Sequence, residues 1–262
     1  MSQSSKQSPK LFTDICLETP TPSNPYLADK RYLQGYDIED LCAKVNPVDI
    51  LFLQFTGNLP PSIESRKILE MLMVYLAIPS PREPASRAAI AVGLSKTNAE
   101  HILPISLMSA GGENAGAAEV QSCYQFITDN LDGSPKQLAK QLIAQWQADS
   151  QSHICPGFGQ LYGDIDDITG RVFASIVNTM PEGKTLSWLR AFNEALNEHN
   201  VGILEIGLAA GVFHQLSMRH RESVGLYQLL KAPGLLAYGM EQTHKPVSTM
   251  PILEDSQYEL KD

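Results

Sequence analysis

The feature that most restricts the fold of this chain is a helical spacing of apolar residues that runs through most of its length. In the segment 63–76, for example, the apolar side chains that share one helical face are Ile68, Leu69, Leu72, Met73 and Leu76. This spacing of three and four residues is typical of an amphipathic helix. No stretch shows a convincing alternation of apolar and polar residues, and no internal repeat is visible. The sequence therefore predicts an all-α protein, a multi-helix globular fold with a large and a small helical subdomain.

Breaks in this pattern set the expected organisation. Residues 1–25 are rich in Ser, Gln and Pro and are expected to form a flexible arm. The helical domain is expected over 26–242, with the small subdomain at roughly 134–200 and a second arm at 243–262. Asp37 is a candidate N-cap for the first helix. Further helices are expected at 47–55, 63–76, 85–94, 99–109, 115–128, 133–146, 172–178, 186–199, 203–216 and 223–238.

Charge and composition exclude several classes of protein. The 262 residues carry a formal net charge of -9, which argues against nucleic-acid binding because that function needs a clustered basic surface. No apolar run reaches the ~18 residues of a transmembrane helix, and residues 1–10 lack the apolar core of a secretory signal. The four cysteines form no C-x-x-C pair and the six histidines have no ligand spacing, so we expect a cytoplasmic protein without a zinc site.

The stretch 155–164, Cys-Pro-Gly-Phe-Gly-Gln-Leu-Tyr-Gly-Asp, punctuates this helical pattern. Pro156 ends the preceding segment, and the glycines allow positive φ and close approach of a ligand to the backbone. Three aspartates that follow it, at 164, 166 and 167, would suit a metal, although a solvated loop is the simpler interpretation. His153 beside Cys155 invites a nucleophilic pair, but without a third orienting group we favour structural roles for both.

Six segments, taken in order over residues 31–242, resemble the citrate synthase family, especially its short citryl-CoA-lyase-like members. They are Gly-Tyr-Asp-Ile-Glu-Asp-Leu at 35–41, Gly-Asn-Leu-Pro at 57–60, Ala-Gly-Gly-Glu-Asn at 110–114, Pro-Gly-Phe-Gly-Gln at 156–160, Asn-Val-Gly at 200–202, and the helix 231–242. The resemblance implies the family's all-α fold. It also implies a site that handles acyl-CoA thioesters and carboxylates, in an acyltransferase or a lyase reaction.

In that family an aspartate removes an α-proton from the thioester, one histidine stabilises the enolate oxygen, and another polarises the acceptor carbonyl. All three matching positions differ here. Ala110 stands at the first histidine, Gln160 at the second and Gly202 at the aspartate. Gln160 keeps an amide N–H that can polarise a carbonyl, but it cannot transfer a proton. Glu113 and Glu205 each lie three residues past a lost group and, if helical, would project from nearly the same face, although a solvent-facing or capping role is favoured for both.

The resemblance also implies ligand contacts. The backbone of Pro156, Gly157, Phe158 and Gly159 matches the loop that holds the adenine end of CoA, so CoA or an acyl-CoA is the expected ligand; a purely structural turn is the alternative. Arg171 and Lys231 match the cations that bind the substrate carboxylates.

Two hypotheses follow. The chain is an acyltransferase or lyase with a rebuilt site, or it is a pseudoenzyme that binds CoA or a partner subunit, such as an active paralogue, as a regulator or scaffold. Family members pair through Ala/Gly-rich helices, and 85–94, 99–109 and 115–118 fit that role, so a homodimer is expected.

Overall fold

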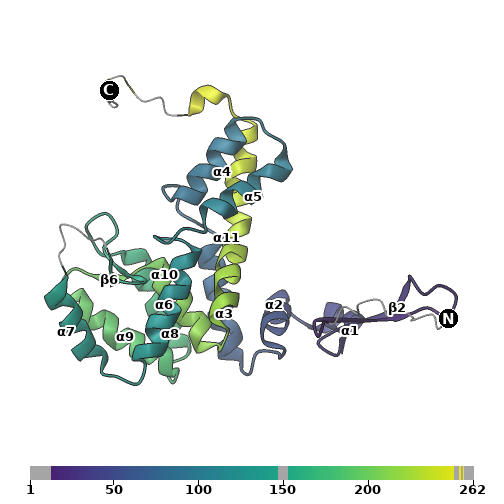
Figure 1. The fold of residues 1–262 in the computed structure, drawn as a ribbon, viewed down its shortest axis with the longest axis horizontal. Coiled ribbons are helices and arrows are strands. Elements are labelled where there is room, and N and C mark those ends of the chain that lie inside the picture. The colour runs from purple at the N-terminus through teal and green to yellow at the C-terminus, as the bar shows by residue number, and fades with distance from the viewer. Residues whose placement is uncertain (1–12, 147–152, 251–253, 255, 257–262) are drawn as a thin grey trace, which may run out of the picture. The chain divides into compact units, whose positions relative to one another are not determined.

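A computed structural model describes residues 13–146, 153–250, 254 and 256. The chain divides into two compact units, one that ends at Arg66 and one that begins at Lys67. Helices dominate, as the sequence predicts, and the chain also forms two small three-stranded sheets (Figure 1). None of the described helices is both long enough and apolar enough to cross a membrane.

The first unit contains a small antiparallel sheet followed by two helices. Strand β1 (Cys16–Pro20) pairs with β2 (Ala28–Leu33), which pairs with β3 (Tyr36–Asp37). Helices α1 (Ile38–Lys44) and α2 (Pro47–Thr56) follow.

Asp37 caps α1, as predicted, because its side chain accepts a hydrogen bond from Glu39 N at 2.9 Å. The prediction of an arm without structure is wrong for 16–20, which form β1; residues 1–12 lie outside the described part. The strand is almost wholly exposed, so no burial pattern marks it in the sequence.

The second unit contains the rest of the helices and the second sheet. Helix α3 (Ile63–Leu76) leads into it. The remaining helices are α4 (Pro84–Leu94), α5 (Ala99–Ser109), α6 (Ala117–Asn130), α7 (Pro135–Gln145), α8 (Asp167–Thr179), α9 (Lys184–Asn197), α10 (Glu205–Gln215), α11 (His220–Thr243) and the 3-10 turn η1 (Val247–Thr249). The helices lie where periodicity predicts them, although several begin or end a few residues away from the expected bounds.

The long helix α11 is the axis on which this unit is built (Figure 1). Helices α4 and α5 pack along its C-terminal half, and α6 and α10 pack along its N-terminal half. Close approach of α4 depends on Gly93, because a Cβ there would lie 2.1 Å from the carbonyl oxygen of Gly239 on α11. The two helical groups therefore meet near the middle of α11.

The second sheet is a small addition to the all-α fold that the sequence predicts. It joins β4 (His153–Cys155), β5 (Phe158–Gly159) and β6 (Gly202–Ile203), all antiparallel. Each strand has only two or three residues, too few to show an alternation. Because Gly202 and Ile203 belong to β6, helix α10 begins at Glu205 and not at 203.

Candidate functional site

The second sheet brings two of the predicted site positions together. Gly159 pairs directly with Gly202 across β5 and β6, and Gln160 follows at the end of β5. The Gln160 side chain donates through Nε2 to the carbonyl oxygen of Asn200 at 3.0 Å. The amide that is expected to polarise a carbonyl is thus engaged with the chain itself.

Gly202 is buried, and the space beside it is occupied. A Cβ at this position would lie 3.1 Å from Cγ2 of Ile165 and 3.3 Å from the side-chain amide of Asn197. Both distances are shorter than ordinary van der Waals contact, so even a methyl group would require its neighbours to shift. A side chain at position 202 therefore fits only if Ile165 and Asn197 move aside.

Ala110 is a core residue at the end of α5. It is buried with Ala85 and Leu235, and its carbonyl accepts a hydrogen bond from Ala117 N at 2.8 Å. The turn 111–116 that separates α5 from α6 is exposed except at Gly116. Glu113 lies in this turn, exposed and outside any helix, so the geometry in which it would replace the lost histidine is absent.

A buried carboxylate that the sequence did not predict as functional connects the glycine-rich loop 156–159 with the turn 111–116. Glu119, in the first turn of α6, accepts hydrogen bonds from the backbone N–H of Gly157 at 2.9 Å and of Ala115 at 2.7 Å. It also forms an ion pair with His153 Nδ1 at 2.9 Å. The sequence signal was present, because Glu119 lies in the same helical stripe as the buried Cys123 and Ile127.

The negative charge of Glu119 and the positive charge of protonated His153 stabilise each other. Burial alone would raise the pKa of the Glu119 carboxyl, but the hydrogen bonds from His153, Gly157 and Ala115 outweigh it, and the pKa lies below its ordinary value. The hydrogen bond to Glu119 raises the pKa of His153 despite partial burial. His153 therefore pairs with a carboxylate. Burial raises the pKa of the Cys155 thiol, which argues against a nucleophilic pair.

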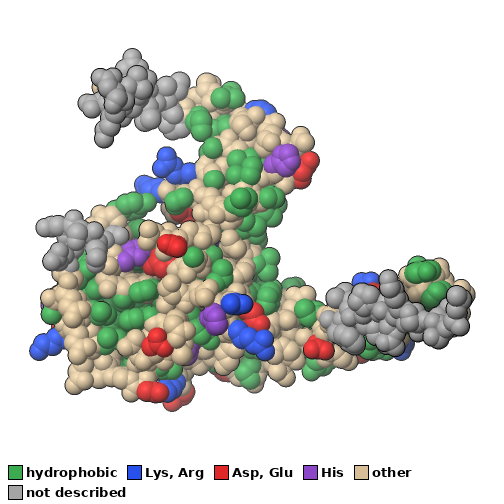
Figure 2. Space-filling model, viewed as in Figure 1, with side chains coloured by type: hydrophobic (Ala, Val, Ile, Leu, Met, Phe, Trp, Pro, Cys, Tyr) green, Lys and Arg blue, Asp and Glu red, His purple; other side chains and the backbone are tan. Residues whose placement is uncertain are grey.

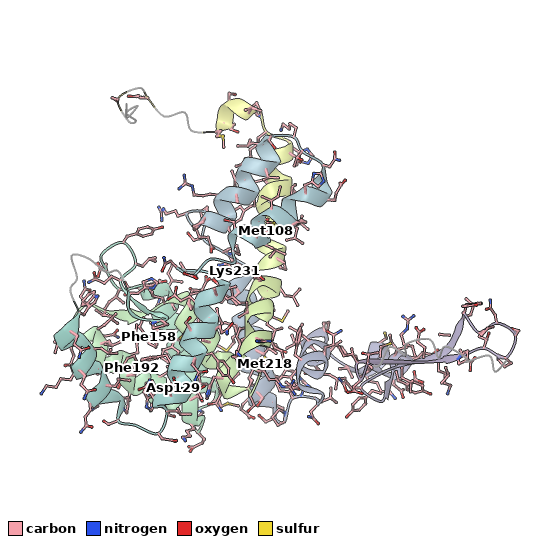
Figure 3. The ribbon with its side chains drawn as sticks, viewed as in Figure 1. Met108, Asp129, Phe158, Phe192, Met218 and Lys231 are labelled. Atoms are coloured by element: carbon pink, nitrogen blue, oxygen red, sulfur yellow. The ribbon has the colours of Figure 1, made fainter. Side chains whose placement is uncertain are left out.

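The Phe158 side chain anchors the glycine-rich loop in the core (Figure 3). It is fully buried and meets Phe192 edge-to-face, with 4.9 Å between the ring centroids. Trp188 stacks on the ring of Phe192, with 5.1 Å between the centroids. Gly157 has a φ of 78°, and a Cβ there would lie 2.6 Å from Cys123 Sγ. Only a glycine fits this turn without strain, so the loop has one defined backbone conformation.

Four residues form a charged group that we call the Lys231 cluster: Glu83, Glu205, Tyr227 and Lys231, of which Tyr227 and Lys231 are buried. Lys231 Nζ forms an ion pair with Glu83 Oε2 and another with Glu205 Oε1 at 2.6 Å, and it donates to Tyr227 Oη at 3.2 Å. Tyr227 in turn donates to Glu205 Oε1 at 2.5 Å. Lys231 lies in the middle of α11, where the two helical groups meet (Figure 3).

The cluster keeps its lysine charged. Burial lowers the pKa of Lys231, but the two carboxylates outweigh it and raise the pKa above its ordinary value. Burial and the charge of Glu205 raise the pKa of Glu83 even though Lys231 acts in the opposite direction. Glu83 therefore takes up a proton more readily than an ordinary glutamate does.

The remaining predicted residues lie apart from this cluster. Arg171 is exposed on α8, and among the described residues it makes no hydrogen bond or ion pair with the Lys231 cluster. Asp166 caps α8 by accepting from Ile168 N and Thr169 N, so it has a structural role. The described residues contain no cluster of His, Cys, Asp or Glu that would hold a metal.

Comparison with known proteins identifies the fold. No protein-family model and no curated protein matches this sequence. Among solved structures, citryl-CoA lyase from Hydrogenobacter thermophilus matches with a TM-score of 0.75 at 17% identity, over 96% of this chain and 94% of that one. The chain has the citrate synthase fold. The fold expected from six short segments is therefore confirmed.

Two further structures share this citrate synthase fold. ATP citrate lyase from Methanothrix soehngenii, solved with citrate and coenzyme A, matches with a TM-score of 0.72 at 13% identity, over 98% of this chain but 44% of that one. Citrate synthase from Thermotoga maritima matches with a TM-score of 0.56 at 10% identity, over 100% of this chain and 98% of that one. At such identities the likeness concerns the fold and leaves the activity to be argued from the site.

Proposed function

We propose that this chain binds CoA or an acyl-CoA on a citrate synthase fold without performing the acid–base chemistry of carbon–carbon bond formation or cleavage. It would act as a pseudoenzyme whose bound thioester regulates or recruits a partner. Structures with this fold have been solved with coenzyme A or with carboxymethyl coenzyme A, which supports a CoA ligand.

The observation that carries the proposal is the filled space at Gly202. A thioester α-proton is a very weak acid, so its removal needs a base placed beside it. Position 202 has no side chain, and Ile165 and the Asn197 amide occupy the space where one would extend. A missing base reduces the rate by about 10²–10⁴-fold and a missing oxyanion donor by about 10²–10³-fold, and such losses do not simply add.

The retained backbone of the 156–159 loop supports ligand binding. Glu119 fixes the N–H of Gly157, and Phe158 anchors the loop in the aromatic core. Both contacts hold the loop in one conformation, with Gly157, Phe158 and Gly159 buried. The loop conformation that would receive CoA is therefore kept although the reactive side chains have been replaced.

The test separates binding from chemistry. Calorimetry with CoA and acetyl-CoA measures binding, and loss of the α-protons of acetyl-CoA in D₂O, followed by NMR, measures the action of a base. We expect saturable binding and an exchange rate equal to that of buffer. Exchange well above buffer would contradict the loss of chemistry, and absence of binding would contradict the CoA assignment.

A second function, an acyltransferase or lyase with Glu205 as the base, is favoured by one observation. Glu205 begins α10, separated from β6 by Leu204 alone, and its side chain is 24% exposed while it accepts from Lys231 and Tyr227. If the chain does exchange α-protons, replacement of Glu205 by Gln should abolish the exchange. A Glu205→Gln variant that exchanges as fast as the natural chain would exclude this role.

We also propose that the chain forms a homodimer. Hydrophobic side chains gather over α5 and the adjoining part of α11 (Figure 2). Met108 is 81% exposed and Ile105 is 42% exposed on α5, and Leu229 is 47% exposed on α11. Light scattering of the purified chain should give twice the chain mass, and a Met108→Asp variant should give a monomer. A monomeric natural chain would contradict the homodimer and leave an active paralogue as the expected partner.

A further inference from the structure

The ammonium group of Lys231 has no free donor. An ammonium group has three N–H bonds. In this structure they are directed at Glu83 Oε2, Glu205 Oε1 and Tyr227 Oη. The lysine side chain is only 1% exposed. An external carboxylate can therefore bind Lys231 only if it displaces one of these three groups.

The two carboxylates of the cluster are not held equally. Glu205 Oε1 accepts two hydrogen bonds, from Lys231 and from Tyr227. Glu83 is held by Lys231 through Oε2, while its Oε1 is buried and has no partner among the described residues. A buried carboxylate oxygen without a donor is unfavourable. Glu83 is therefore the group that is most easily displaced.

Glu83 also reaches the cluster from a separate element. It is the N-cap residue of α4, and its side chain makes no capping hydrogen bond to that helix. Glu205 and Lys231 belong to α10 and α11. The orientation of Glu83 is thus explained by the lysine and not by the helix that it precedes. Its carboxylate takes up one of the three contacts of the Lys231 ammonium group.

We propose that Glu83 is a built-in occupant of the carboxylate-binding position at Lys231 and excludes external carboxylate ligands from it. The inference rests on the proposed function, since it explains how a site can accept a CoA thioester while rejecting a small di- or tricarboxylate. A third carboxylate beside Glu83 and Glu205 would leave two uncompensated negative charges around one buried ammonium. The thioester group of an acyl-CoA is uncharged and would not incur this penalty.

The experiment measures binding of tricarballylate, an unreactive tricarboxylate, by calorimetry. The natural chain should show no saturable binding. Glu83→Gln removes the charge and keeps the shape, and Glu83→Ser removes the occupant and supplies a favourable N-cap residue. Both variants should bind tricarballylate at least about tenfold more tightly than the natural chain, because a charge-assisted contact becomes available.

Three controls test whether the gain in tricarballylate binding depends on Glu83 and Lys231. Glu100→Gln, which removes an exposed carboxylate on α5, should leave the absence of binding unchanged. Adding Lys231→Met to Glu83→Ser should abolish the gained affinity. Circular dichroism should show that each variant keeps its helical content. The second Glu83 variant keeps the test valid if one of the two fails to fold.

Two results would overturn the inference: binding of tricarballylate by the natural chain as tight as by the variants, or folded Glu83 variants that gain no affinity. Binding of CoA is measured on the same samples. A gain for tricarballylate without CoA binding would refute the proposed function and leave the role of Glu83 intact. CoA binding without a gain would refute the role of Glu83 alone.

Discussion

The carboxylate of Glu119 accepts a hydrogen bond from the backbone N–H of Gly157 at 2.9 Å, and this contact joins α6 to the glycine-rich loop. The second oxygen of Glu119 accepts from Ala115 N, in the turn that follows Ala110. One buried side chain therefore sets the separation of two loops that carry predicted site positions. Loss of this side chain should affect both stability and ligand binding.

Replacement of Glu119 by Ala should destabilise the fold by about 2–3 kcal/mol, because the buried N–H of Gly157 and the part-buried N–H of Ala115 then lose a charged acceptor. It should also weaken CoA binding by more than the Glu119→Gln variant, which keeps one oxygen acceptor. Urea unfolding gives the first quantity and calorimetry the second. Glu100→Gln, on the surface of α5, is the matched control and should change neither. Equal stability of Glu119→Ala and the natural chain would contradict the structural role.

The ion pair of Glu119 with His153 should make stability depend on pH. The raised pKa of His153 stabilises the fold below its ordinary value of 6.5, and this contribution is lost as pH rises through the raised pKa. The lowered pKa of Glu119 stabilises the fold above its ordinary value of 4.5, and this contribution is lost as pH falls through the lowered pKa. Both contributions are complete between 4.5 and 6.5.

The measurement compares the natural chain with His153→Gln by urea unfolding across this range and above it. The difference in unfolding free energy should be largest near pH 6 and should shrink toward pH 9. The buried thiols of Cys123 and Cys155 adjoin the pair, but burial raises both pKa values, so neither thiol should titrate below pH 9. A difference that stays constant with pH would show that His153 acts only through packing.

The periodicity of the sequence was sufficient for the helices but not for the second sheet. Strands β5 and β6 have two residues each, and their pairing depends on residues that are more than forty positions apart. The structure pairs Gly159 with Gly202, and Gln160 follows at the end of β5. The side chains around Gly202 could not be predicted from the sequence, because Ile165 and Asn197 come close to Gly202 only through tertiary packing.

The ion pairs of the charged residues could not be predicted from the sequence either. Lys231 was predicted as a cation for a substrate carboxylate, and Glu205 as a replacement base. Their mutual ion pair joins two helices that are separated along the chain. Glu83 precedes a proline in a loop with three prolines, where a glutamate usually faces solvent. Its burial against Lys231 follows from the packing of α4 on α11 and from no local signal.

Restoring an aspartate at position 202 should not restore chemistry. Gly202→Asp must displace Ile165 or the Asn197 amide and buries a carboxylate, so we expect destabilisation of about 1–3 kcal/mol and no proton exchange from acetyl-CoA. Gly225→Asp is the matched control, because a Cβ at Gly225 on α11 meets no atom within 4 Å. Exchange above buffer in a stable Gly202→Asp protein would show that the space can open.

The Lys231 cluster gives the sharpest stability prediction. Lys231→Met leaves the carboxylates of Glu83 and Glu205, which are 19% and 24% exposed, without their cation. Loss of one partner from a fully buried ion pair costs about 3–5 kcal/mol, and partial exposure should make the loss here smaller. Adding Glu83→Gln should recover part of this loss, because one uncompensated charge is then removed. Unfolding free energies of the single variants and the double variant form a thermodynamic cycle that isolates the interaction.

The cost of Lys231→Met should also fall as pH falls. The groups that face Glu83 are Glu205, Lys231, Tyr227 and Tyr75, and the charge of Glu205 raises the pKa of Glu83 already in the natural chain. Without the lysine, only the backbone of Ser80 opposes this effect, so Glu83 takes up a proton more readily and the repulsion weakens. Unfolding of Lys231→Met near pH 5 and pH 8 measures the change. A cost that is the same at both values, or no recovery in the double variant, would mean that the two glutamates do not interact through this lysine.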